Sequence, residues 1–382
     1  MHISNFTRLS NGYFWYFAVL GLAMPFLAVW LEGRGFSSQS MGEMLAIFTA
    51  TKIVGPTFWA FFADKSGRQL SVIRAGASLS LIFFIGLFFV DGYWPITLFL
   101  AAFSLFWTGV LPQYEVLTLN SFRNNPKIYA RIRLWGSIGF IALAVIGGEV
   151  IASLGSESFL TLGLAVLFGL WLSTLSMKER EGGRKARNEV KGMSERIFNL
   201  PFVYFFLAGL LLQISFGPYY SFFALYVRDL GYPSYAVGAL IGVSVVAEVL
   251  IFVLMGRVFK RFSVFQVLTF SIAITGIRWL ISAKLGQVLP LLIIAQVMHA
   301  ASYALYHSAS MQFIQSHFKF GQHNRGQAIY ISGVYGVGGA LGAYIAGLLW
   351  QDGAGIELSY IAAGVCALTG AFFAGLLMVA KK

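Results

Sequence analysis

The feature of this sequence that most restricts its fold is a series of twelve long apolar runs. Each run is close to the roughly 20 residues that an α-helix needs to cross the hydrocarbon core of a bilayer. They fall near residues 8–31, 39–63, 69–90, 95–118, 130–153, 158–177, 200–226, 235–258, 263–284, 289–314, 325–350 and 357–380. Only 11% of the 382 residues are charged, whereas a soluble domain usually carries about 25%. The sequence therefore predicts an all-α membrane protein with twelve transmembrane helices and excludes an ordinary soluble enzyme.

The charges in the loops predict how the chain is oriented. Of the 27 Lys and Arg residues, 22 fall on the side of the two termini and 3 on the other side. Because cytoplasmic loops carry the excess of Lys and Arg, we expect both termini in the cytoplasm. The net charge of +12 is then a sign of topology and does not support nucleic-acid binding.

The predicted spans divide into two similar sets of six. Residues 35–42 resemble residues 231–238, and Pro95 and Pro290 each open the fourth helix of their set. Parallel repeats of this kind place a substrate site near the middle of the membrane. The predicted architecture is two pseudo-symmetric six-helix bundles, at 1–177 and 200–382, joined by a polar cytoplasmic linker at 178–199.

Charged side chains inside the spans are the candidates for function, because a charge at the bilayer centre costs ~2.5–3.5 kcal/mol on insertion scales. The candidates are Lys52, Glu115, Arg133, Glu248, Arg278 and, if it is protonated, His299. Lys52 and Glu248 occupy equivalent places in the two halves, so a pseudo-twofold axis would face them across one cavity. Glu115 and Arg133 lie on consecutive helices at similar depth. Static ion pairs that fix helix packing are the alternative role for all of these charges.

The loop between the second and third predicted spans reads Ala63-Asp64-Lys65-Ser66-Gly67-Arg68. It resembles the loop signature of the major facilitator superfamily, although Ala60 stands where that signature has a glycine. In this loop Asp64 can pair with a base or with a helix N-terminus and so latch one conformation. We therefore expect Asp64 and Arg68 to form a conformational latch, with a solvated basic cluster as the alternative.

The entry to the fifth span is more specific. The segment Tyr129-Ala-Arg-Ile-Arg133-Leu-Trp-Gly-Ser-Ile-Gly-Phe140 resembles that of the lactose-permease type of facilitator. The resemblance implies that Arg133 pairs with Glu115 and that both bind substrate. It also places Phe140 where that type has an aromatic side chain that stacks on a sugar ring.

The second half carries the same resemblance through Glu248, Arg278 and His299. One difference matters, because Ser302 stands where the lactose-permease type has its proton-carrying glutamate. Segments such as Gly276-Ile-Arg278-Trp279 look most like a group of 3-phenylpropionic acid transporters within the same lineage. The resemblance implies the facilitator fold and a small organic substrate.

These features together predict a secondary active transporter of the bacterial inner membrane that works by alternating access. We expect proton-coupled uptake of a small organic solute such as an aromatic carboxylic acid. The expected substrate-binding residues are Lys52, Glu115, Arg133, Phe140, Arg278 and His299, and the expected proton-coupling residues are Glu248, Glu115 and His299. Aromatic side chains that can clasp a ring or pack in the core are Trp15, Tyr219, Tyr220, Phe140 and Trp279. The alternatives are symport of a sugar, oligosaccharide or nucleoside with protons, a drug:proton antiporter, and a uniporter.

An enzyme is the least favoured class, because the chain has no nucleophile elbow, phosphate-binding loop or zinc-protease motif. Its one cysteine, Cys366, lies in an apolar run and forms no metal motif. We expect no metal and no cofactor beyond the coupling proton. The expected partners are the substrate, protons and the lipid bilayer, with no nucleic acid and with the chain acting as a monomer.

Overall fold

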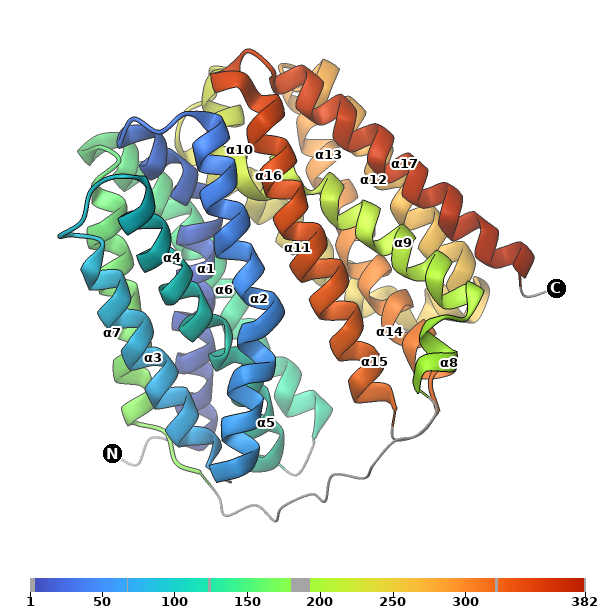
Figure 1. Ribbon diagram of the computed structural model, residues 1–382, viewed down its shortest axis with the longest axis horizontal. Helices are drawn as coiled ribbons and strands as arrows, with labels where there is room; N and C mark the ends of the chain where they lie inside the picture. Colours follow the sequence, from blue (N-terminus) through green and yellow to red (C-terminus); the bar gives the residue numbers. More distant parts are fainter. Residues whose placement is uncertain (1–3, 67, 123–124, 180–192, 320–321, 381–382) are drawn as a thin grey trace. The chain divides into compact units, whose positions relative to one another are not determined.

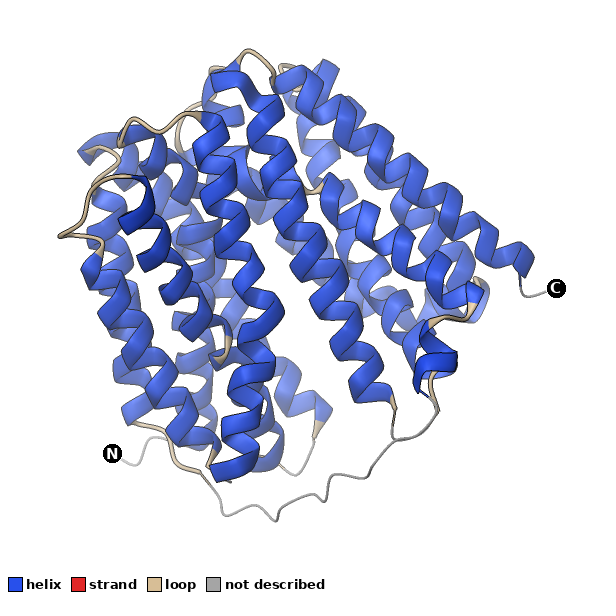
Figure 2. Cartoon of the chain, viewed as in Figure 1, coloured by secondary structure: helices blue, strands red, loops and turns tan. Residues whose placement is uncertain are grey.

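A computed structural model describes residues 4–66, 68–122, 125–179, 193–319 and 322–380. Within these residues every regular element is a helix, and the helices are joined by short loops (Figure 2). Twelve helical segments of the described residues are long and apolar enough to cross a membrane, which confirms the predicted fold class. Their outer faces expose large apolar side chains such as Ile82, Leu154 and Val253, as helices that face lipid do.

The first six spans (Figure 1) are α1 (Asn5–Gly33), α2 (Ser38–Ser66), α3 (Gln69–Gly86), α4 (Tyr93–Thr108) with α5 (Val110–Ser121), α6 (Pro126–Leu154) and α7 (Ser158–Leu175). A short helix, α8 (Met193–Ile197), precedes the second six. These are α9 (Leu200–Ser215) with α10 (Gly217–Asp229), α11 (Tyr235–Arg261), α12 (Val264–Leu285), α13 (Leu289–Ala300) with α14 (Tyr306–His317), α15 (His323–Tyr330) with α16 (Gly338–Trp350), and α17 (Ile356–Ala380). Two π-helical turns, η1 (Ala301–Leu305) and η2 (Ile331–Val337), interrupt spans 10 and 11, and a 3₁₀ turn, η3 (Gln351–Gly353), ends span 11.

Proline explains two of the helix breaks. Span 4 breaks at Gly109 and span 7 breaks at Phe216. Pro112 and Pro218 lie in the first turn of the helix that follows each break, where a missing N–H leaves no gap in the hydrogen bonding. Pro25, by contrast, lies inside α1, which continues through it.

The helices group into two compact units. Unit 1 comprises residues 1–36, 47–186 and 232–239, and unit 2 comprises residues 37–46, 187–231 and 240–382. Most of the predicted linker, at residues 180–192, lies outside the described part of the chain.

Glycines allow close helix crossings in both units. In unit 1, a Cβ atom added at Gly21 or at Gly139 would lie 2.2 Å from a backbone oxygen of the facing helix, so α1 and α6 touch backbone to backbone. In unit 2, a Cβ atom added at Gly217 would lie 2.1 Å from the carbonyl oxygen of Gly342. These glycines of spans 5 and 11 therefore serve packing, the role that their sequence pattern favours.

Candidate functional site

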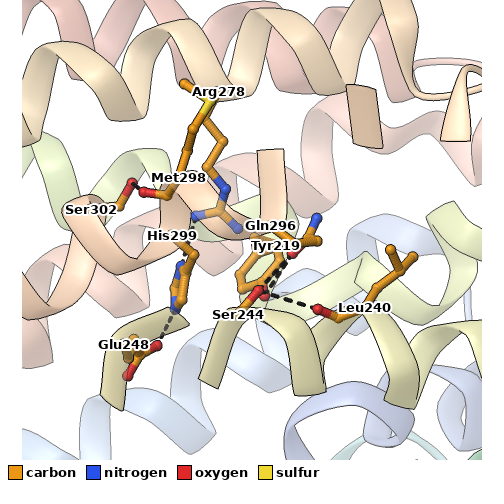
Figure 3. A network of polar contacts seen from close by, with 9 residues as sticks. All are labelled: Tyr219, Leu240, Ser244, Glu248, Arg278, Gln296, Met298, His299 and Ser302. Atoms are coloured by element: carbon orange, nitrogen blue, oxygen red, sulfur yellow. Dashed lines mark hydrogen bonds and ion pairs between the residues drawn. The ribbon is translucent and has the colours of Figure 1, made fainter. Parts of the chain in front are cut away.

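Three polar residues from separate spans form a connected network in unit 2 (Figure 3). Nη1 of Arg278, on α12, lies 2.7 Å from Nδ1 of His299, on α13. Nε2 of His299 lies 2.9 Å from Oε1 of Glu248, on α11. Arg278 is fully buried, and the side chains of His299 and Glu248 are 7% and 15% exposed. The structure thus joins three residues that the sequence singled out separately.

The contacts of His299 determine which of its nitrogens carries the proton. A guanidinium has only donors, so Nδ1 of His299 must accept from Arg278. The proton of the neutral imidazole is then on Nε2, which donates to the carboxylate of Glu248. The network consists of a cation, a neutral ring and an anion. A second proton on His299 would set two donors against each other at the contact with Arg278.

The guanidinium of Arg278 is incompletely bonded. Its Nε and Nη2 atoms are buried and have no partner at hydrogen-bonding geometry among the described residues, and the Tyr219 hydroxyl interacts with the guanidinium only at longer range. Leaving a buried donor without a partner costs about 1–3 kcal/mol. These two atoms form one edge of the guanidinium, and such an edge binds both oxygens of a carboxylate. Arg34 of this chain uses the same two atoms to bind Glu157, at 2.5 and 2.8 Å.

Aromatic rings surround the same guanidinium. Its Cζ atom lies 4.2 Å from the ring centre of Trp279, 4.4 Å from that of Tyr219 and 5.8 Å from that of Phe216. Tyr220 stacks on Phe216 with ring centres 4.9 Å apart. Ring faces attract a guanidinium and offer flat apolar walls to a ligand. The site therefore combines a cation with an open hydrogen-bonding edge and an aromatic surface.

A neutral polar group adjoins Tyr219. The hydroxyls of Tyr219 and Ser244 both donate to Oε1 of Gln296, at 3.2 and 3.0 Å (Figure 3). Gln296 is 1% exposed and lies one helical turn before His299. Gln296 and Ser244 are not among the residues predicted from the sequence, because neither is charged. The available signal was the position of Gln296, which puts an amide on the same helix face as His299.

The predicted residues of unit 1 form no comparable network. Glu115, on α5, accepts a hydrogen bond from the hydroxyl of Tyr129 at 3.1 Å. Arg133, on α6, lies over the ring of Phe17, with Cζ 3.8 Å from the ring centre. The ion pairs of the described residues do not include one between Glu115 and Arg133. The charge of Arg133 acts on Glu115 from beyond ion-pair distance. The direct pairing that the sequence resemblance implied stays a prediction.

Three further candidates lie on helices of unit 1. Lys52 is half-buried on α2, and the described part of the chain gives it no ion pair. Phe140 is 9% exposed at the crossing of α1 and α6. Trp15 covers Gly169 of α7, which gives this ring a packing role. The pairing of Lys52 with Glu248 stays a prediction.

The predicted latch lies between α2 and α3. The side chain of Asp64 and residue 67 are outside the described part of the chain. Arg68 is exposed and makes no side-chain cap at the start of α3. The carboxylate of Glu179 instead accepts from the N–H groups of Gln69 and Leu70, at 2.8 and 3.2 Å. Glu179 therefore occupies the kind of helix N-terminus that Asp64 was expected to bind.

The described side chains include no group of three His, Cys, Asp or Glu residues that could hold a metal ion. Ser302 donates to the carbonyl of Met298 at 3.2 Å and is no substitute for a titrating acid (Figure 3). Of the titratable groups predicted in spans 8 to 10, His299 contacts Arg278 directly and Glu248 is linked to Arg278 through His299.

Comparisons with known proteins agree with this architecture. The sequence profile of the MFS_1 like family matches residues 6–362. A probable 3-phenylpropionic acid transporter of Escherichia coli (strain K12) is 30% identical over 347 residues, which is 90% of either chain. A maltose permease of Geobacillus stearothermophilus is 24% identical and covers 97% of this chain and 93% of its own length. The crystal structure of the nucleoside transporter NupG superimposes with a TM-score of 0.85 over 100% of both chains, at 17% identity. The chain therefore belongs to the MFS_1 like family and is a multi-pass membrane transporter of the major facilitator type, not an enzyme.

Proposed function

We propose that this transporter carries a small organic anion, such as an aromatic carboxylic acid, together with a proton. Transport occurs by alternating access across the bacterial inner membrane, with both termini in the cytoplasm. The observation that carries the proposal is the unpartnered edge of Arg278, buried among aromatic rings. The 3-phenylpropionic acid named for the Escherichia coli relative has the two parts that suit such a site, a carboxylate and a ring.

Charge balance links the anion to the proton. A carboxylate bound at Arg278 gives the buried network a net negative charge, and an uncompensated buried charge costs several kcal/mol. A proton on Glu248 restores neutrality, and Oε1 of the protonated acid still accepts from His299. The anion and the proton therefore bind more tightly together than apart, and their joint transport is electroneutral.

Within this scheme Glu248 holds the proton and His299 orients Arg278. His299 is the poorer proton carrier because its protonation breaks the contact with Arg278. Glu115 and Arg133 remain candidates for substrate contact, since neither is committed to an ion pair in the described residues.

A hydroxylated neutral solute is the second candidate substrate. Gln296 and Ser244 next to Tyr219, and Glu115 next to Tyr129, offer hydrogen-bonding groups for hydroxyls. The maltose permease and NupG similarities favour testing sugars and nucleosides. Drug:proton antiport has weaker support, from multidrug resistance proteins such as the one of Enterobacter lignolyticus, 24% identical over 56% of this chain.

The test is uptake of labelled 3-phenylpropionate into proteoliposomes with acid outside. Wild-type protein is expected to accumulate the probe until a protonophore collapses the pH gradient. Glu248→Gln keeps a hydrogen-bond acceptor but takes no proton, so we expect exchange of the probe without accumulation. Glu149→Gln, which changes an exposed glutamate of α6, is the matched control. Full acid-driven accumulation by Glu248→Gln would overturn the role of Glu248, and inhibition by sugars or nucleosides but not by the acid would favour the second candidate.

A further inference from the structure

Span 10 carries a second histidine that the scheme above does not use. His307 follows His299 by eight residues, or about 12 Å along a helix. The ring of Tyr303 lies between them, with ring centres 6.1 Å from His299 and 6.0 Å from His307 and interplanar angles of 8° and 10°. Nδ1 of His307 lies 3.4 Å from the hydroxyl of Tyr335, which belongs to the π-helical turn η2. Three parallel rings therefore lead from the Arg278 network toward span 11.

The π-helical turn η1 explains why these rings stay parallel. Residues four apart in an α-helix do not lie directly above one another, because one turn takes 3.6 residues and their side chains therefore differ in direction around the helix axis. The π-helical turn η1 has more residues per turn, so it reduces this difference in direction between His299 and His307. Turns of this kind are frequent at functional sites.

The two histidines differ in the kind of partner they have. Nδ1 of His299 is held by Arg278, which can only donate, so an added proton breaks that contact. The hydroxyl of Tyr335 can accept from Nδ1–H of His307, which leaves Nε2 able to gain and lose a proton without disturbing the contact. His307 is the histidine of this ladder that can change its protonation state in place.

The other titratable groups near the pair are phenols, namely Tyr303, Tyr306 and Tyr330 and, close to Tyr335, Tyr220. The ion pairs of the described residues do not include His307. No carboxylate in an ion pair therefore holds a proton on this ring.

We propose that His307 is a proton-relay residue that carries the proton from Glu248 toward the cytoplasm. This rests on the proton coupling proposed above. The O–H bond of Glu248 breaks, the proton crosses to Nε2 of His307 through water, and the imidazolium then releases a proton to cytoplasmic water. Glu248 returns to the carboxylate form and His307 to the neutral ring. The relay sets the rate of proton release, while Arg278 and Glu248 set its coupling to the anion.

The experiment compares two rates in proteoliposomes, with 3-phenylpropionate as the probe. Net uptake driven by a pH gradient needs the proton to leave, whereas exchange of labelled for unlabelled probe at equal pH does not. We expect His307→Gln to slow net uptake about tenfold with exchange unchanged. This is less than the roughly 100-fold that a lost proton-transfer group can cost, because conformational change shares control of the rate. Tyr335→Phe should slow net uptake by a smaller factor.

Tyr204→Phe is the matched control, because the ring of Tyr204, on α9, packs against Phe373 of α17, and both rates should stay at the wild-type level. Imidazole in the medium should restore net uptake by His307→Ala, which a purely structural role does not predict. Wild-type net uptake by both His307→Gln and Tyr335→Phe would overturn the relay and leave the proposed function intact. Wild-type protein that exchanges the probe without moving protons would overturn both.

Discussion

Two arginines of this chain present the same edge to different surroundings. Arg34, in the loop after α1, binds both oxygens of Glu157 through Nε and Nη2 and binds Asp91 through Nη1. Arg278 binds His299 through Nη1, and its Nε and Nη2 have no partner within the described residues. The Nε–Nη2 edge of Arg34 is bonded and lies at the surface, whereas the same edge of Arg278 is buried without a partner, where unpaired donors cost more free energy. Stability alone would favour partners for the buried donors first, so the difference indicates that the edge of Arg278 is kept for a ligand.

The polar residues of the two units differ in a similar way. In unit 2, Glu248, His299 and Arg278 hold one another, so each depends on the others. In unit 1, Glu115 contacts Tyr129 and Arg133 contacts Phe17, and neither is in an ion pair of the described residues. Removing one member should therefore have different consequences in the two units.

The largest effect is expected at Arg278. Arg278→Lys keeps a positive charge but loses the two-atom edge, so 3-phenylpropionate binding should weaken by about 2–5 kcal/mol, the usual cost of truncating a buried charged pair. Isothermal titration on purified protein measures this loss. Lys284→Ala is the control, because Lys284 lies on the same helix but pairs with Glu357 at the surface. The affinity of this variant for 3-phenylpropionate should match that of the wild type. Equal affinity in Arg278→Lys would remove the main support for an anion site.

An intermediate effect separates the two units by stability. Glu248→Ala removes the carboxylate that accepts from His299, and a hydrogen bond to a charged group contributes about 1.5–3 kcal/mol. Glu115→Ala removes one hydrogen bond, with a net cost of about 1 kcal/mol. Thermal unfolding in detergent without substrate should therefore show a larger fall in Tm for Glu248→Ala. Equal shifts would mean that the two units hold their acids in the same way.

The smallest effect is expected at the filled edge of Arg34. The adjacent guanidinium lowers the pKa of the Glu157 carboxyl, mainly through their hydrogen bonds. Stability from this pair is therefore present at neutral pH and is lost as the pH falls through the lowered pKa. Because the carboxylate is 53% exposed, Glu157→Gln should cost at most about 1 kcal/mol at neutral pH.

Unfolding of Glu157→Gln and wild-type protein at neutral pH and at about pH 3, below the ordinary carboxyl pKa, checks this prediction. The difference between the two proteins should shrink at the lower pH. Arg34→Gln should show the same small, pH-dependent loss. A difference that does not change with pH would show that the pair acts through packing alone.

Much of the fold could be predicted because membrane spans depend on composition. Twelve apolar runs indicate twelve spans without knowledge of any contact, and Pro218 marks the break in span 7. Of the candidate site, only the residues whose side chains carry or can carry a charge inside a span could be predicted, namely Glu248, Arg278 and His299. Which of them contact one another could not be predicted, because that depends on side-chain directions that the spacing does not encode.

Contacts of neutral residues and contacts between distant parts of the sequence could not be predicted, for related reasons. Gln296 and Ser244 carry no charge, so nothing in the pattern sets them apart from polar residues that bond their own helix. Glu179 caps α3 from a segment 109 residues farther along the chain than Leu70, and a contact of that range is not visible in a loop motif. The contact of Arg133 with the ring face of Phe17, at 3.8 Å, was also not predicted, because Phe17 is an apolar residue of another helix.

The central claim is that the Arg278–His299–Glu248 network joins one proton to one anion. The most direct measurement records proton entry, with a pH dye inside proteoliposomes, and 3-phenylpropionate entry at several membrane potentials. Coupling of one proton to one anion predicts equal proton and anion fluxes that do not respond to the potential in wild-type protein, and no proton flux in Glu248→Gln. Unequal fluxes, uptake that follows the membrane potential, or undiminished proton flux in Glu248→Gln would contradict it.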